Sequence, residues 1–156
     1  MRGGYSNCLI PKLPTPENQN FKSWSKILND TKIDEDDIIV AWSTGAIFIV
    51  RYLYENKLKV KKLILISGFN NYIGNVPAVD NINKSLFIKD LSVVKNISKK
   101  IICIKSDKDP FITQDALNDF ADKLEATIIN IKNGGHFNLN AGYDKFPQLL
   151  DIILNK

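Results

Sequence analysis

The sequence predicts an α/β protein, a three-layer arrangement in which helices cover both faces of a parallel sheet. Short apolar runs rich in Ile and Leu alternate with segments whose apolar residues recur at helical spacing. The apolar runs show no alternation with polar residues, which is typical of parallel strands that are buried on both faces. A chain of 156 residues with 44% hydrophobic side chains can bury one core, so we expect residues 1–156 to form a single domain.

The first part of the chain predicts a strand, a helix and a second strand. Asn7–Pro11 is a short apolar run that ends at proline, and it is interpreted as a strand. Asn20 can cap a helix whose apolar residues recur at helical spacing, namely Phe21, Trp24, Ile27 and Leu28. Asp37–Trp42 is apolar on both faces and predicts a central strand.

The middle of the chain continues the alternation and then becomes less regular. Thr44–Asn56 predicts a buried helix, and Lys62–Ser67 predicts another central strand. The segment Phe69–Lys99 is the least regular, with many asparagines and a short helix expected over Leu86–Val94.

The last third of the chain predicts two strands and two helices. Lys100–Ser106 is a third central strand, and Thr113 can cap a helix that runs through Glu125. Thr127–Ile131 follows as a strand. Asp144–Leu154 predicts a closing helix, in which Pro147 is tolerated because it falls in the first turn.

Composition and charge disfavour several classes of function. The net charge of +4 comes from dispersed lysines, without a basic stripe interleaved with aromatic residues, so nucleic-acid binding is not expected. No apolar run approaches the ~20 residues that span a bilayer, and no signal-peptide pattern is present. We therefore expect a cytoplasmic protein without a membrane partner. Cys8 and Cys103 both lie in apolar runs and are interpreted as buried free thiols.

Three chemically reactive residues follow predicted strands. Ser43, Asp109 and His136 each come after a different strand, and ligands of parallel sheets bind at the carboxyl ends of the strands. A serine hydroxyl needs a base to remove its proton, histidine is suited to that task near neutral pH, and a carboxylate fixes the imidazole tautomer. The order Ser, Asp, His along the chain is that of α/β-hydrolases.

Each of these residues also has a structural interpretation. Ser43 could be a turn or cap residue, and it stands in A-W-S-T-G, where Ala41 replaces the first glycine of the G-x-S-x-G nucleophile turn. Asp109 could begin a turn before proline, with Asp107 as the capping residue instead. His136 could be a surface or core histidine. The three together favour the catalytic interpretation, because each follows a strand and their order is the expected one.

The chain resembles the retinoblastoma-binding-protein-type family of small serine hydrolases, in the α/β-hydrolase superfamily. The resemblance extends from Tyr5 to the last helix, and the matching stretches are Pro11–Asn18, Ala41–Ala46, Ser106–Pro110 and Gly134–Phe137. It implies that Ser43 is the nucleophile, Asp109 the acid and His136 the base. It also implies that the backbone N–H of Thr44 is an oxyanion-hole donor.

The sequence departs from that family in two places. Ala41-Trp42 stands where the family more often has Gly-His. The resemblance also implies a strand ending in a His-Gly loop, followed by a helix, ahead of Tyr5, and the sequence shows neither. We therefore expect an N-terminally shortened fold with one of two oxyanion donors. The apolar residues of the closing helix are then expected to be partly uncovered, namely Phe146, Leu149, Leu150 and Ile153.

These observations predict a serine hydrolase that cleaves a small ester, thioester or amide by acyl transfer. The alternative is a catalytically weak or inactive binding module with the same fold. A nucleotide binder is disfavoured because no glycine-rich phosphate loop follows a strand. We expect no cofactor and no metal, and a small-molecule acyl substrate that contacts Trp42, Tyr72 and Phe87. The segment that contains Tyr72 and Phe87 could equally be a plain surface connection. A protein partner or a homo-oligomer is left open.

Overall fold

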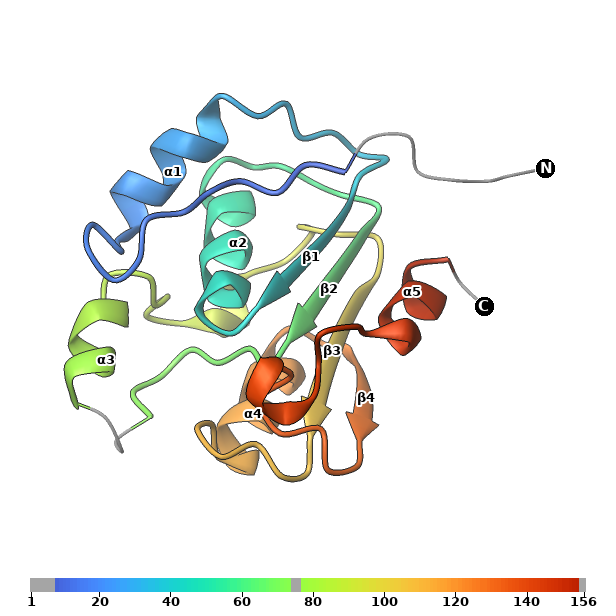
Figure 1. Ribbon diagram of the computed structural model, residues 1–156. Coiled ribbons are helices and arrows are strands. Elements are labelled where there is room, and N and C mark those ends of the chain that lie inside the picture. The colour runs from blue at the N-terminus through green and yellow to red at the C-terminus, as the bar shows by residue number, and fades with distance from the viewer. Residues whose placement is uncertain (1–7, 74–76, 155–156) are drawn as a thin grey trace.

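The computed structural model describes residues 8–73 and 77–154, with the side chain of residue 78 left out. In this part of the chain, four parallel strands form one sheet in the order β1-β2-β3-β4 (Figure 1). The strands are β1 (Ile38–Trp42), β2 (Lys62–Ile66), β3 (Ile101–Ser106) and β4 (Thr127–Ile131). The four strands predicted from Asp37 onward are therefore present. β1 was predicted to be central, but it lies at an edge of the described sheet, because β2 is the only strand paired with it there.

Helices connect consecutive strands and cover the sheet. The connections contain α2 (Thr44–Glu55), α3 (Pro77–Asn83) with the 3₁₀ turn η1 (Leu91–Val93), and α4 (Gln114–Lys123). Outside them lie α1 (Phe21–Asn29), the 3₁₀ turn η2 (Leu139–Ala141) and α5 (Pro147–Ile153). Strands in chain order with right-handed connections place those connections on one face of a sheet.

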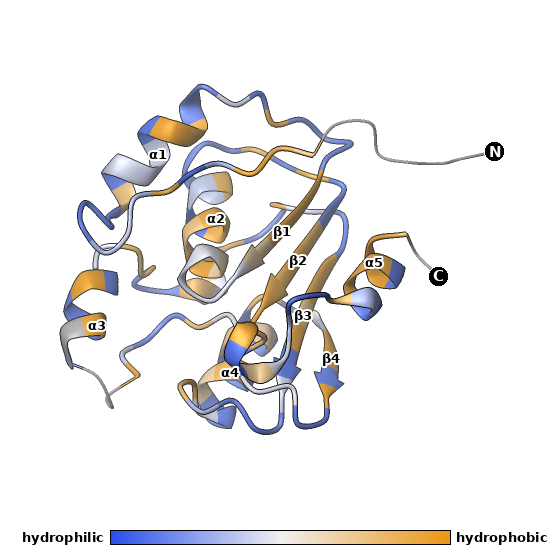
Figure 2. Ribbon diagram, in the orientation of Figure 1, coloured by the Kyte–Doolittle hydropathy of each residue, from blue (hydrophilic) through white to orange (hydrophobic). Residues whose placement is uncertain are grey.

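The larger core lies on that face. Alternate strand residues such as Ile39, Leu63 and Cys103 point toward it and pack against α1, α2 and α4. Figure 2 shows that the strands are hydrophobic along most of their length, as expected for a sheet covered on both faces. The side chain of Phe48 on α2 packs edge-on against Trp24 of α1, with 5.1 Å between the ring centroids.

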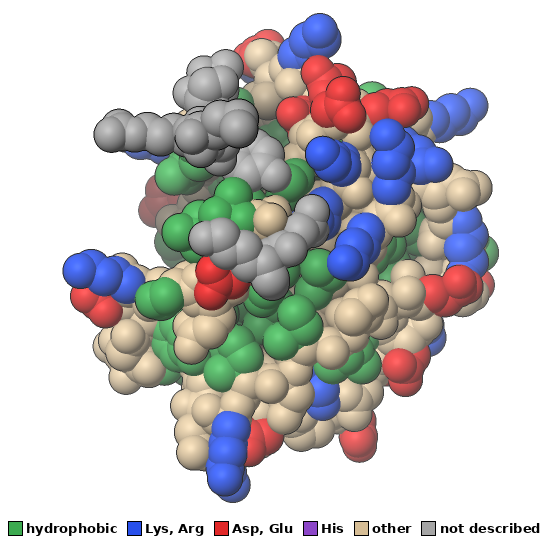
Figure 3. Space-filling view, turned by 90° about the vertical axis from the view of Figure 1, so that its right-hand side faces the viewer, with side chains coloured by type: hydrophobic (Ala, Val, Ile, Leu, Met, Phe, Trp, Pro, Cys, Tyr) green, Lys and Arg blue, Asp and Glu red, His purple; other side chains and the backbone are tan. Residues whose placement is uncertain are grey.

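The opposite face of the sheet packs against the C-terminal segment and α5. Ile64, Ile66, Ile102 and Ile104 form a second cluster there with Phe137. No residue of α5 is fully buried, and Leu150 is 56% exposed, as the sequence predicted for this helix. This side of the molecule faces the reader in Figure 3, where hydrophobic side chains are exposed among charged ones.

A buried lysine of the sheet forms hydrogen bonds with the end of α5. Lys62, on β2, is 3% exposed, and its Nζ donates hydrogen bonds to the carbonyl oxygens of Ile152 and Ile153 at 3.0 and 3.1 Å. These carbonyls belong to the last turn of α5, where C=O groups lack the N–H donor four residues ahead that earlier turns have. Burial, together with the charges of Lys100 and Lys61, lowers the pKa of Lys62.

The structure corrects two predictions near the N-terminus. Asn7 lies outside the described residues, and residues 8–11 form no strand; Leu9 and Ile10 are 67% and 83% exposed. The apolar run was too short to indicate strand pairing, and Pro11 cannot donate to a ladder. Cys8 is exposed rather than buried, whereas Cys103 is buried, and burial raises the pKa of its thiol to about 12.

The segment between β2 and β3 also differs from prediction. The helix expected over Leu86–Val94 is only the 3₁₀ turn Leu91–Val93, capped by Asp90, whose carboxylate accepts from Ser92 N–H at 3.0 Å. The sequence analysis did not predict α3, which begins at Pro77, a residue well suited to a first helical turn. None of the described helices is long and apolar enough to cross a membrane.

Two glycines give a matched test of the packing. A methyl group at Gly45, on α2, meets no atom within 4 Å, whereas one at Gly68 would lie 2.3 Å from the buried ring of Phe120. Gly45→Ala should raise the free energy of unfolding by about 0.5 kcal/mol, because alanine reduces the entropy of the unfolded chain. Gly68→Ala should lower it by about 1–3 kcal/mol through overpacking.

Urea denaturation of the two variants measures both effects. Equal stability of Gly45→Ala and Gly68→Ala would contradict the close packing of Phe120 against residue 68.

Candidate active site

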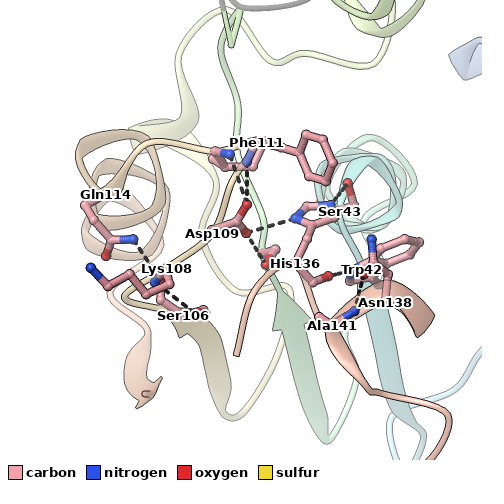
Figure 4. Close-up of polar contacts among 12 residues, drawn as sticks. Trp42, Ser43, Ser106, Lys108, Asp109, Phe111, Gln114, His136, Asn138 and Ala141 are labelled. Atoms are coloured by element: carbon pink, nitrogen blue, oxygen red, sulfur yellow. Dashed lines mark hydrogen bonds and ion pairs between the residues drawn. The ribbon is translucent and has the colours of Figure 1, made fainter. Parts of the chain in front are cut away.

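Four polar residues lie at the carboxyl ends of the four strands, one after each strand. Ser43 follows β1, Ser67 follows β2, Asp109 lies beyond β3, and His136 lies beyond β4. Because the carboxyl ends of parallel strands meet at one edge, the four side chains converge there. Figure 4 shows Ser43, His136 and Asp109 in one line of polar contacts.

Ser43 occupies a strained turn between β1 and α2. Its φ is 55° and its ψ is −126°, a conformation that non-glycine residues rarely adopt and that costs about 1–3 kcal/mol. Its backbone N–H donates to the carbonyl of Ile66 at 2.8 Å, which extends the ladder between β1 and β2 past the strand end. The turn therefore forms with Ala41 in place of the first glycine of the motif.

His136 contacts both other residues of the predicted triad. Its Nε2 lies 3.1 Å from Ser43 Oγ, and its Nδ1 lies 2.9 Å from Asp109 Oδ2. In the tautomer with the proton on Nδ1, His136 donates to the carboxylate and accepts from the serine hydroxyl. The residue is 7% exposed, so the imidazole is held by the protein around it.

The glycines before His136 are required by close packing. A Cβ at Gly134 would lie 2.6 Å from the ring of Phe137, and one at Gly135 would lie 2.7 Å from Ala141 Cβ. Gly135 also has φ of 56°, in the left-handed region that favours glycine. These two residues let the loop after β4 turn back toward the site.

Asp109 is fully enclosed and surrounded by donors. Its side chain is 0% exposed. Oδ1 accepts from the backbone N–H groups of Phe111 and Ile112 at 3.0 and 3.1 Å, and Oδ2 accepts from Ser67 Oγ at 2.8 Å as well as from His136. Burial raises the pKa of this carboxyl, but the four donors outweigh burial and lower the pKa below its ordinary value.

The structure distinguishes Asp109 from Asp107. Asp107 Oδ1 accepts a hydrogen bond from the backbone N–H of Asn133 at 2.6 Å, and so it holds the loop before His136. Asp109 is the carboxylate that contacts the imidazole. The turn role that the sequence allowed for Asp109 is also present, because it accepts from the N–H groups that follow it.

Ser67 is a site residue that the sequence analysis missed. It is fully buried with φ of 47°, and its N–H donates to the carbonyl of Ile104 at 2.9 Å. Its position directly after an apolar strand and before Gly68 was the available signal, and it is the same signal that identified Ser43. Its hydroxyl shares the oxygen of Asp109 that His136 contacts.

Aromatic rings lie on two sides of His136. The rings of Trp42 and Phe111 are each 5.1 Å from the imidazole, centroid to centroid, and both side chains are 45% exposed. An open cleft of about 330 Å³ adjoins His136, bordered also by Lys108, Phe111 and Asn138.

Tyr72 and Phe87, predicted to bind substrate, form a separate ring pair. Their centroids are 5.6 Å apart, and Phe87 also contacts Phe69. Thr44, the predicted oxyanion donor, is the first residue of α2, where backbone N–H groups have no acceptor within the helix. The roles of these three residues, and the predicted contact of Trp42 with substrate, stay predictions.

Comparisons with known proteins agree with this architecture. The chain is 28% identical over 150 residues to the serine hydrolase RBBP9 of Rattus norvegicus, covering 94% of this chain and 75% of the relative. It is 24% identical over 148 residues to YdeN of Bacillus subtilis (strain 168), covering 92% of this chain and 77% of YdeN.

Solved structures show the same fold. The crystal structure of the ydeN gene product from B. subtilis superposes with a TM-score of 0.80 at 23% identity, covering 92% of this chain and 78% of that one. A meta-cleavage product hydrolase from Pseudomonas fluorescens IP01 superposes with a TM-score of 0.64 at 12% identity, covering 92% and 75%.

The family assignment follows from the sequence match together with this fold. Residues 13–155, nearly the whole chain, match the serine hydrolase family. This agrees with the resemblance drawn from the motifs around Ser43 and His136. The chain belongs to the serine hydrolase family, within the α/β-hydrolase superfamily, and is a hydrolase.

Proposed function

We propose that this protein hydrolyses a small ester, thioester or amide by acyl transfer, with Ser43 as nucleophile, His136 as base and Asp109 as the residue that orients His136. One observation carries the proposal. A continuous line of polar contacts runs from Ser43 Oγ to His136 Nε2 at 3.1 Å and from His136 Nδ1 to Asp109 Oδ2 at 2.9 Å. Such a line is the arrangement that activates a serine hydroxyl.

The first half-reaction forms an acyl-enzyme. Ser43 Oγ attacks the carbonyl carbon of the substrate while its proton moves to His136 Nε2. The oxygen of the tetrahedral intermediate carries a negative charge, and the N–H of Thr44 at the start of α2 is the donor proposed to stabilise it. As the intermediate collapses, the bond to the leaving group breaks, and His136 gives that group its proton.

The second half-reaction regenerates the enzyme. A water molecule loses a proton to His136 Nε2 and attacks the acyl carbon. The bond between that carbon and Ser43 Oγ then breaks, and the proton on His136 returns to the serine. The carboxylic acid leaves, so the overall reaction adds one water across the ester, thioester or amide bond.

Asp109 supports both half-reactions without changing its own protonation. Its low pKa keeps it ionised, so Oδ2 fixes the proton on His136 Nδ1 and leaves Nε2 free to accept. Ser67 and the N–H groups of Phe111 and Ile112 hold the carboxylate in place. The negative charge also stabilises the imidazolium that forms in each half-reaction.

A fluorophosphonate probe tests the nucleophile. The wild-type protein should form a covalent adduct on Ser43, seen as a mass increase of the intact protein, and Ser43→Ala should form none. Ser92→Ala removes a serine hydroxyl from the distant turn η1 and should label like the wild type. A folded wild-type protein that takes up no probe would contradict the proposal and favour a binding module with the same fold.

Substitution of Asp109 tests the orienting role. Asp109→Asn should lower the labelling rate on the order of 10⁴-fold, because the amide favours the wrong imidazole tautomer. Asp107→Asn, which alters a neighbouring carboxylate that binds Asn133 instead, provides the control. Equal losses in the two variants would contradict the assignment of Asp109.

The same carboxyl predicts how stability depends on pH. Its pKa is lower in the folded than in the unfolded state, so the ionised form stabilises the fold above about pH 4. That contribution is lost as the pH falls through the folded-state pKa. Urea denaturation at several pH values should therefore show the stability gap between wild type and Asp109→Asn narrowing below about pH 4. A difference in unfolding free energy between the two proteins that stays constant down to pH 2 would contradict the lowered pKa of Asp109.

A further inference from the structure

Trp42 makes a contact that its position in the sequence does not suggest. It is the last residue of β1, directly before Ser43. Its indole Nε1–H donates a hydrogen bond to the backbone carbonyl of His136 at 2.8 Å, across 94 residues of chain. Figure 4 shows the indole beside the imidazole, on the side away from Asp109.

This contact joins the two segments that carry the nucleophile and the base. The indole holds the backbone of His136 through the hydrogen bond, and its ring lies 5.1 Å from the imidazole, tilted by 52°. Phe111 contacts the imidazole edge-on, also at 5.1 Å. The imidazole is thus held by a ring from the end of β1, a ring from the loop after β3, and the carboxylate of Asp109.

The loop around His136 is held by contacts on both sides of that residue. Asp107 accepts from the N–H of Asn133, and the buried ring of Phe137 packs against Tyr143 and Phe146. The two residues before His136 are Gly134 and Gly135, and the N–H of Phe137 donates to Gly134 O at 3.2 Å in a tight turn. Since Gly134 and Gly135 have no side chains, they add no such contact, and the carbonyl of His136 takes its donor from another element. The Trp42 indole is the donor to that carbonyl in the described part of the chain.

We propose that Trp42 is a positioning residue that holds His136 within hydrogen-bonding distance of Ser43. Its indole N–H is engaged by the protein, so the polar edge of the ring serves the loop and not a substrate. The catalytic consequence of this role rests on the proposed function. Movement of a catalytic group by about 1 Å can cost ~10²-fold in rate.

Two tryptophans give a matched comparison. Trp24 donates its Nε1–H to the carbonyl of Pro14 at the same 2.8 Å, but in the core between α1 and α2. Trp42→Phe removes the donor and keeps a smaller aromatic ring, and it should lower the rate of fluorophosphonate labelling roughly 3- to 10-fold. Trp42→Ala should lower it by ~10²-fold. Trp24→Phe should reduce thermal stability and leave the labelling rate unchanged.

The single histidine of the chain provides a readout that does not depend on activity. In the protein grown with isotope-labelled histidine, the NMR spectrum should show one imidazole with a slowly exchanging proton on Nδ1. In Trp42→Phe that proton should exchange faster and its resonance should broaden. The spectrum of Trp24→Phe should match that of the wild type.

The outcomes separate the two proposals. An unchanged imidazole resonance and labelling rate in Trp42→Phe would overturn the role of Trp42. Equal losses in Trp42→Phe and Trp24→Phe would also overturn it, because they would indicate a general loss of stability. If the wild type takes up no probe, the proposed hydrolysis fails, while the imidazole spectrum still decides whether Trp42 holds His136.

Discussion

The parallel backbone ladder is the constraint on which the rest of this structure depends. Its hydrogen bonds continue one residue beyond the strands, from Ser43 N–H to Ile66 O and from Ser67 N–H to Ile104 O. Both serines have positive φ, and the ladder supplies the bonds that hold them there. Because the strands lie in chain order, the ends of β1 to β4 are neighbours, and the site is assembled from four successive loops. The strained backbone of Ser43 and Ser67 is thus offset by the strand pairing and burial of the whole sheet.

Asp109 shows how the protein keeps a charge inside its fold. An ionised carboxylate away from water is costly unless it is fully hydrogen-bonded. Here donors from three parts of the chain meet that need: the hydroxyl of Ser67, two N–H groups of its own turn, and His136. Among these donors, His136 is the one that also contacts Ser43, through Nε2 at 3.1 Å. Backbone and serine donors fix the carboxylate, and the carboxylate fixes the imidazole.

The sequence predicted what local pattern determines. Continuous apolar runs identified all four strands, and the order of Ser43, Asp109 and His136 after those strands indicated which side chains meet. Prediction was wrong where an apolar run has no neighbouring strand with which to pair. Residues 8–11 form no strand in the described structure, and Ile10 is 83% exposed. The contact of Ser67 was missed although Ser67 also follows an apolar strand, as Ser43 does. The contact of Trp42 was not predictable, because its acceptor is a backbone carbonyl, which every residue carries and no residue type marks.

The placement of the two tryptophans has an optical consequence. The chain contains two indoles in dissimilar surroundings: Trp24 is 4% exposed in the core beside Phe48, and Trp42 is 45% exposed against the imidazole. Intrinsic fluorescence therefore combines two signals of distinct origin. Emission from Trp24 should follow the packing of α1 against α2, whereas emission from Trp42 should follow the surroundings of His136. The native protein thus contains two intrinsic probes, one in the core and one beside the contact between Ser43 and His136.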